Sequence, residues 1–245
     1  MNHFSKSLVY TLLGQRGSVG RRPIIFVAHS LGGMVCKEAL NLGSKRQDLQ
    51  SILTNTLGII FMGTPHGGSH IAGWGNTVAE YVNVFRGTNR DILGNLLPGS
   101  SDIQRTEEDF QHMLLRKDIS LKLYCFYEAL KMNDIVGKIV ERESAILPAY
   151  DNCSIDANHR TMTKFTGRPD AGYSQVRGVR ERWLKDREIN DSHCDADQLE
   201  NTSRAAHGAS GAFYHSPVFN GPISGRYVIP GAQITGGTVN FNFPG

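Results

Sequence analysis

The sequence lacks paired cysteines, long apolar runs and an excess of charge of either sign. Its four cysteines stand far apart with no secretory signal before them, so we expect an intracellular, reduced protein without a disulfide framework. No apolar stretch approaches the roughly 20 residues that span a bilayer, so we expect no transmembrane helix. A net charge of +3 excludes a basic protein that coats nucleic acid, and we expect no nucleic-acid partner.

Zinc and phosphate-loop patterns are also missing. The loosely grouped His193, Cys194 and His207 fit no zinc spacing. The glycine-rich segment at residues 63–68 lacks the lysine of a phosphate-binding loop. We therefore predict no metal site.

With 245 residues, of which 40% are hydrophobic, the chain can form one real core plus an appendage.

Apolar runs of strand length alternate with segments of helical period over residues 1–187. The runs lie at residues 23–29, 57–62 and 121–127. The helical segments between them lie at residues 34–42, 78–85 and 107–115. This order predicts an α/β domain with a doubly wound, mostly parallel sheet.

The remaining residues differ from this domain in composition. Residues 188–210 are polar and show no hydrophobic period, which predicts a flexible linker. Residues 211–245 contain one formal charge, seven glycines, four prolines and six aromatic residues. Such a segment cannot build an ordinary core, and it is too apolar to be a solvent-exposed tail. We therefore expect it to contact another surface.

The first strand runs directly into Ser30 and then into helical sequence. This strand–turn–helix context predicts a nucleophile elbow, in which a strained turn lifts the serine hydroxyl above the sheet. Ala28 and Gly32 are small, as the turn requires. The N–H of Leu31, at the start of the following helix, would point at a developing oxyanion.

An acid and a histidine are expected after the serine, in that order. Glu128 leaves the third strand at the edge where open α/β sheets gather their site residues, so it is the first candidate for the acid. His159, in a loop further along the chain, is the candidate base. Because residues 139–141 can be interpreted as a further strand, three other acids remain open: Asp134, Glu141 and Glu143.

The glycine-rich turn after the second strand should lie beside Ser30 on the same sheet edge. We expect His66 and Gly67 of this turn to shape the pocket. Two roles stay open for His66, contact with the substrate or burial within the turn.

The segments AHSLGG, FMGTPHGG, CFYE and ESA…NHRTMTKF together resemble the lipase-like α/β hydrolases related to SERAC-type serine esterases and GPI-inositol deacylases. The resemblance covers about residues 8–180, and within fungi the chain looks most like the SesB effector-type hydrolase domain. It implies Ser30 as nucleophile, His159 as base and Glu128 as acid. The implied substrate is an ester or a lipid, with no metal and no organic cofactor. A cytoplasmic location is expected, with peripheral contact at mitochondrial or endoplasmic reticulum membranes as a further option.

The C-terminal segment resembles the sigma-type prion-forming motif of fungal effectors associated with NLR-type receptors. Residues 238–243 alternate polar and apolar side chains without charge, which agrees with cross-β stacking. The resemblance implies homotypic amyloid assembly and a receptor that carries a matching motif. The residues that carry it are Phe219, Asn220, Gly221, Gly225, Gly237, Val239, Phe241 and Phe243.

The chain departs from this family before the elbow. Only 22 residues precede Pro23, so we expect the early strands to be absent, the first strand to form an apolar edge, and the second oxyanion donor to be missing. Two functions stay open. One is a serine esterase or lipase controlled by amyloid templating in fungal self/non-self recognition or cell death. The other is an inactive hydrolase whose function is amyloid signalling.

Overall fold

The computed structural model describes residues 2–17, 22–66, 101–135, 137–207, 233–235 and 238–240. The chain divides into two units, Met1–His193 and Cys194–Gly245. The elements of the first unit, in chain order, are α1 (Asn2–Arg16), β1 (Ile24–His29), α2 (Gly32–Lys45), η1 (Gln47–Leu49), α3 (Gln50–Asn55), β2 (Thr56–Met62), α6 (Ser101–Leu114), β3 (Lys122–Glu128), α7 (Arg142–Ala145) and β4 (Asp151–Ile155). Helix α8 (Ala171–His207) begins in the first unit and ends in the second.

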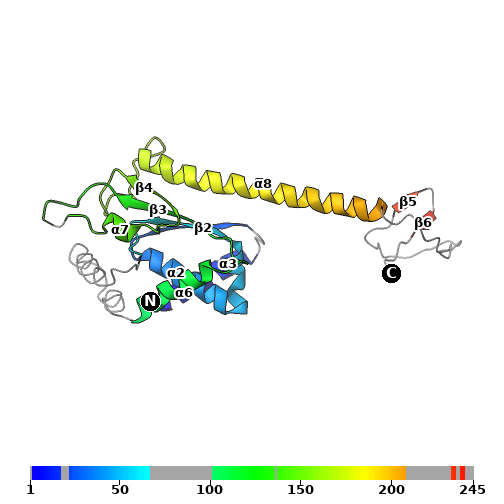
Figure 1. The fold of residues 1–245 in the computed structure, drawn as a ribbon, viewed down its shortest axis with the longest axis horizontal. Helices are drawn as coiled ribbons and strands as arrows, with labels where there is room; N and C mark the ends of the chain where they lie inside the picture. Colours follow the sequence, from blue (N-terminus) through cyan, green and yellow to red (C-terminus); the bar gives the residue numbers. More distant parts are fainter. Residues whose placement is uncertain are drawn as a thin grey trace. The chain divides into compact units, whose positions relative to one another are not determined.

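The described strands of the first unit form a four-stranded sheet in the order β1-β2-β3-β4, and each neighbouring pair is parallel. Figure 1 shows α2, α3 and α6 on one face of this sheet and the beginning of α8 on the other. Because parallel strands bring their carboxyl ends to one edge, the residues that follow β1, β2 and β3 lie close together. The predicted α/β fold with a mostly parallel sheet is confirmed.

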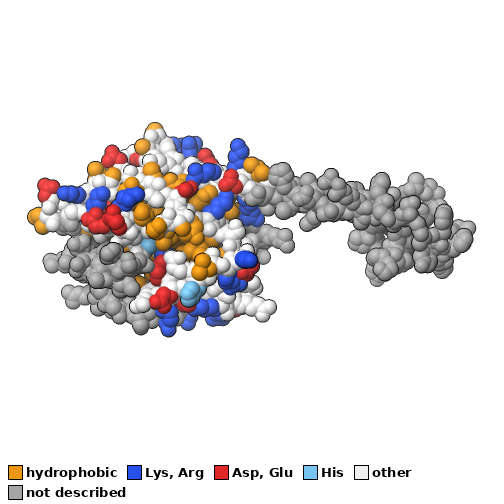
Figure 2. All heavy atoms as spheres, in the orientation of Figure 1, with side chains coloured by type: hydrophobic (Ala, Val, Ile, Leu, Met, Phe, Trp, Pro, Cys, Tyr) orange, Lys and Arg blue, Asp and Glu red, His pale blue; other side chains and the backbone are white. Residues whose placement is uncertain are grey.

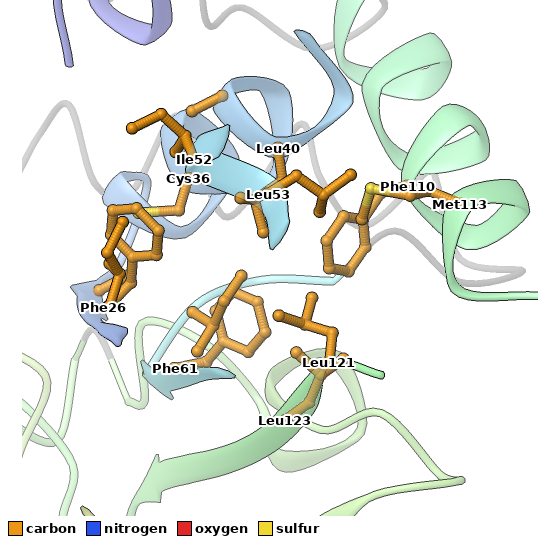
Figure 3. Packing of buried hydrophobic residues seen from close by; sticks show 14 of the residues in the cluster. Phe26, Cys36, Leu40, Ile52, Leu53, Phe61, Phe110, Met113, Leu121 and Leu123 are labelled. Carbon is orange, nitrogen blue, oxygen red and sulfur yellow. The ribbon is translucent and has the colours of Figure 1, made fainter. Parts of the chain in front are cut away.

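Alternate side chains of each strand feed two cores, one on each face of the sheet. Phe61 of β2 packs with Leu40 and Phe110 of the helices below, as Figure 3 shows. Its neighbours Ile60 and Met62 pack on the opposite face, in the cluster that contains Val179 and Trp183 of α8. This two-sided burial explains why the strands appear in the sequence as continuous apolar runs.

The surface of the described residues carries both signs of charge. On the face drawn in Figure 2, basic and acidic side chains are interspersed around a central area of hydrophobic ones. Strand β1 borders the described sheet, and its Val27 is 56% exposed. The described helices do not combine the length and the apolar character that crossing a bilayer requires.

Most of the predicted elements are found, but one predicted strand is wrong. Residues 139–141 form no strand, because the Val140 N–H is donated to the Glu128 carboxylate instead of a sheet partner. The fourth strand is β4, which sequence reasoning missed because it is a short, half-polar edge strand. The predicted helix at residues 78–85 lies outside the described residues.

The predicted linker also differs from the structure. Helix α8 continues through His207, so residues 188–207 are helical. No glycine or proline interrupts the chain between Gly178 and His207, and the helix-favouring residues Arg, Glu and Ala recur there. The helix propensity of these residues therefore accounts for helical structure over residues 188–207, which the hydrophobic pattern does not predict.

The second unit contains a short antiparallel pair, β5 (Gln233–Thr235) and β6 (Thr238–Asn240), with Ile234 opposite Val239. Val239 thus lies in a strand, in the segment where the sequence predicts cross-β structure. The other predicted motif residues lie outside the described ones: Phe219, Asn220, Gly221, Gly225, Gly237, Phe241 and Phe243.

Candidate active site

Ser30 lies in a sharp turn between β1 and α2. Its φ is 54°, in the left-handed region that a non-glycine residue occupies at a cost of about 1–2 kcal/mol. Two backbone hydrogen bonds hold the turn, from Ser30 N to Met62 O (2.9 Å) and from Gly33 N to Ser30 O (3.1 Å). This is the geometry of a nucleophile elbow, with backbone strain stored at the serine.

His159 approaches Ser30 from the loop that follows β4. Its Nε2 lies 2.9 Å from Ser30 Oγ, and the two residues are 0% and 3% exposed. Because a serine hydroxyl donates to an imidazole nitrogen, the ring proton of neutral His159 belongs on Nδ1, 3.5 Å from Glu128 Oε1. The three residues that the sequence predicts for a triad therefore lie together.

Glu128 ends β3 and is 1% exposed. Its Oε1 accepts the Val140 N–H at 2.7 Å, and its Oε2 accepts the His159 backbone N–H at 2.8 Å. These amides stabilise the carboxylate away from water. The competing acids are instead exposed to solvent: Asp134, Glu141 and Glu143.

His29 is a neighbour of the site that sequence reasoning missed. Its Nε2–H donates to the His159 backbone carbonyl at 2.9 Å, and the two rings are 4.9 Å apart. Burial is the main cause that lowers the pKa of His29 to about 4, so its ring stays neutral near pH 7. The sequence pattern of a nucleophile elbow allows any residue directly before the serine. The pattern therefore gave no indication that His29 contacts His159.

The turn after β2 fits tightly against both the nucleophile and the base. Gly63 has a φ of 55°, and a Cβ there would lie 2.9 Å from His159 Nδ1. A Cβ on Gly33 would lie 2.3 Å from Thr64 Cγ2, whereas a Cβ on Gly32 would meet no described atom within 4 Å. The steric demand that we predicted for Gly32 therefore falls on Gly33.

His66 lies in the same turn, but it faces the interior. It is 5% exposed, and its Nδ1 is 2.8 Å from Lys37 Nζ. Burial and the neighbouring Lys37 hold the pKa of His66 well below its usual range. Of the two roles left open for His66, burial in the turn agrees with these contacts, and the predicted pocket role does not. Gly67 lies outside the described residues.

Leu31 is the residue before the first turn of α2. A helix N-terminus carries partial positive charge, so the position suits an amide that faces an oxyanion. The described residues include no group of three side chains arranged to hold a metal ion.

Comparison with known proteins gives likenesses over parts of the chain, and no family model matches it. The chain is 33% identical over 149 residues to Protein SERAC1 of Bos taurus and 30% identical over 149 residues to that of Homo sapiens. These matches cover 60% of this chain but 22% of each relative, so the chain spans about a fifth of their length.

Two solved structures show a weaker likeness. The lipase BlEst2 of Bacillus licheniformis, in its mature form, has a TM-score of 0.44 and 18% identity, over 64% of this chain and 66% of that chain. Est816, described as an N-acyl homoserine lactone degrading enzyme, has a TM-score of 0.35 and 12% identity, over 71% of this chain and 74% of that chain.

Proposed function

We propose that this protein is a serine hydrolase that cleaves carboxylic esters, including lipid esters. The observation that carries the proposal is the 2.9 Å contact between Ser30 Oγ and His159 Nε2, at a strained elbow beside a buried carboxylate. A nucleophile and a base within hydrogen-bond reach, with a third group orienting the base, constitute the minimum machinery for acyl transfer.

The reaction follows from this geometry in two steps. His159 Nε2 takes the hydroxyl proton as Ser30 Oγ attacks the ester carbon, and it returns that proton to the departing alcohol. Water then attacks the acyl-serine by the same route and releases the acid. Glu128 stabilises the imidazolium formed in each step, and the Leu31 N–H stabilises the oxyanion.

Covalent labelling with a fluorophosphonate probe tests the proposal. Ser30 Oγ attacks phosphorus, fluoride leaves and His159 accepts the proton, so labelling requires an activated serine. We expect the purified chain to be labelled and Ser30→Ala to be silent. Ser51→Ala, at an exposed serine of α3, serves as the matched control and should label normally. A folded chain that stays unlabelled contradicts the proposal.

The substrate class requires a separate assay. A series of p-nitrophenyl esters from acetate to palmitate, offered in solution and on vesicles, distinguishes a general esterase from a lipase. We propose a cytoplasmic site of action with peripheral contact to membranes, for which a vesicle-dependent rise in rate with the long-chain esters is the expected result. Equal rates with and without vesicles would contradict the membrane contact.

We propose further that residues 211–245 control this hydrolase by amyloid templating from an NLR-type receptor with a matching motif. The low charge of the segment and the pairing of β5 with β6 support this role. A peptide of residues 211–245 should form thioflavin-positive fibres, and Val239→Pro should prevent them because proline removes a backbone donor.

Labelling and fibre formation together distinguish the alternative function, amyloid signalling by an inactive hydrolase, from control of an active enzyme. Fibres that change the labelling rate of the full chain support control of the enzyme. Fibre formation by a chain that never labels supports signalling alone, and an absence of fibres contradicts both roles of the segment.

A further inference from the structure

Directly beneath the site lies a chain of buried polar side chains that the proposed reaction does not use. Its members come from four different elements: Lys37 of α2, Glu107 of α6, His66 of the turn after β2, and Cys125 of β3. Lys37 is 0% exposed and is among the largest fully buried side chains described. A buried lysine is costly to desolvate, so its partners need explanation.

Lys37 Nζ donates to two acceptors. One is Glu107 Oε2 at 2.5 Å, and the other is His66 Nδ1 at 2.8 Å. Because a lysine only donates, His66 must accept at Nδ1 and carry its proton on Nε2, 3.6 Å from Cys125 Sγ. Lys37 therefore fixes both the orientation and the tautomer of the His66 ring.

The His66 backbone is fixed as well. Its N–H donates to Ser144 O at 2.6 Å, and its ring packs edge-on against Phe61 at 4.7 Å. This residue is thus held by a side chain, by a backbone carbonyl and by an aromatic face. The end of the turn that contains His66 has little freedom to move.

The other residues of this turn contact the reacting groups. Met62 O accepts the Ser30 N–H, and the backbone of Gly63 lies against His159 so closely that a Cβ would reach Nδ1 at 2.9 Å. The side chain of Thr64 fills the space beside Gly33. Five consecutive residues, 62–66, therefore connect the nucleophile, the base and the buried lysine.

We propose that Lys37 is a positioning residue which, through His66, holds the turn at residues 62–66 at the spacing that Ser30 and His159 require. This inference rests on the proposed hydrolase function. Lys37 lies two helical turns after Ser30 on α2, the helix that begins at the elbow, so one side chain sets the distance between that helix and the turn.

A stabilising ion pair alone would not need His66. Apolar residues of similar volume often replace a buried ion pair without loss of stability. The positioning role and the structural role therefore give different results when Lys37 and Glu107 are replaced together by apolar residues. The single Lys37→Met variant is uninformative, because it leaves the Glu107 charge buried without its partner.

The test compares two double variants across the same pair of helices. Lys37→Met/Glu107→Leu removes the buried pair, and Lys45→Met/Asp109→Leu makes the same changes at the exposed pair that also joins α2 to α6. Hydrolysis of p-nitrophenyl butyrate gives kcat and KM, and thermal unfolding gives Tm. We expect the first variant to remain folded and to keep its KM but to lose about 10²-fold in kcat, the scale of an ångström misplacement. The control should keep all three.

Three results would contradict the inference. Unchanged kcat in a folded Lys37→Met/Glu107→Leu chain, while the unsubstituted chain is active, overturns the positioning role and leaves the hydrolase intact. No turnover by the unsubstituted chain, with no fluorophosphonate labelling, overturns both. Equal losses in the control variant would assign the effect to the contact between the helices and would also overturn the inference.

A second pair of variants covers the case in which the double variant fails to fold. His66→Asn retains an acceptor near the position of Nδ1, whereas His66→Leu retains none. We expect the asparagine variant to keep most of the kcat and the leucine variant to lose it. Slower hydrogen exchange at the Gly63 N–H in His66→Asn than in His66→Leu is the expected signature that does not depend on activity. Equal kcat and equal exchange overturn the inference.

Discussion

Glu128 serves the His159 backbone and ring together. Its Oε2 accepts the His159 N–H while its Oε1 lies 3.5 Å from the ring Nδ1, so one carboxylate positions the His159 backbone and also faces its ring. The Val140 N–H on Oε1 prevents the carboxylate from rotating. A single residue thus couples the end of β3 to the loop after β4.

Replacing Glu128 by glutamine should inactivate the protein without unfolding it. The amide keeps the shape of the carboxylate, but its NH₂ group would face a backbone donor and the imidazolium would lose its counter-charge. By analogy with amide substitution of a triad acid, kcat should fall by roughly 10⁴-fold. Steady-state hydrolysis of p-nitrophenyl butyrate measures this. Glu141→Gln, at an exposed competitor for the same role, should leave kcat unchanged, and a large loss there would contradict the assignment.

Gly63→Ala should reduce activity more than its cost in stability explains. A left-handed φ of 55° costs alanine about 1–2 kcal/mol in unfolding free energy, and the new Cβ would displace His159. Gly137 provides the control, because its φ is 71° but a Cβ there would meet nothing within 4 Å. Both variants should lose stability in urea, Gly63→Ala by more because its Cβ also displaces a neighbour, while only Gly63→Ala should lose kcat. Equal kcat in the two would contradict the close fit.

The grouping of Ser30, Glu128 and His159 was predictable at this scale, whereas the contacts that support it were not. Ser30 stands in a local motif, and Glu128 and His159 follow from chain order and from the place where strands end. His29, Gly33 and Lys37 act through contacts with residues 29 to 130 positions away along the chain, such as Thr64, His66 and His159. No local pattern encodes such contacts.

Among the elements, the strands with mostly apolar sequences were predictable, whereas the half-polar strand β4 and the later part of helix α8 were not. The runs that became β1, β2 and β3 are mostly apolar, because helices pack on both sides of the sheet. Strand β4 borders the sheet and has one buried residue, Ile155, so its sequence carries almost no strand signal. Near the start of helix α8, Val179 and Trp183 are buried against Ile60 and Met62 of β2.

That contact makes a prediction for α8. Trp183 is 5% exposed, and Gly58 leaves it room, since a Cβ at Gly58 would lie 2.5 Å from Trp183 Cζ3. Trp183→Ala should lower the free energy of unfolding by about 3–5 kcal/mol, as measured by urea denaturation. Arg180→Ala, at an exposed position of the same helix, should change it by less than about 0.5 kcal/mol. Similar losses in both would place the stabilising contact elsewhere.

For the whole first unit, burial of neutral histidines makes stability depend on pH. The pKa of His29 falls from 6.5 in the unfolded chain to about 4, and that of His66 is also lowered. Between pH 6.5 and pH 4 the unfolded chain binds more protons than the folded chain. The free energy of unfolding is therefore highest with respect to these histidines above pH 6.5, and it falls as the pH drops toward 4. The fall from His29 alone approaches about 1.4 kcal/mol per pH unit.

Urea denaturation at pH 7 and pH 5 checks this dependence. The unfolding free energy should be lower at pH 5, and His29→Gln, which keeps a donor for the His159 carbonyl, should reduce the difference between the two pH values. A difference that is unchanged in His29→Gln would show that other groups carry the acid sensitivity of the unit.

The backbone at Ser30 also bears on how such a chain would change over generations. A φ of 54° suits glycine and penalises every other side chain, so the turn and the reaction favour different residues at one position. Random substitution to glycine would relieve the turn and destroy the nucleophile together. A lineage released from the need for chemistry would drift to glycine here, whereas a lineage that still depends on the chemistry would retain serine against the preference of its own backbone.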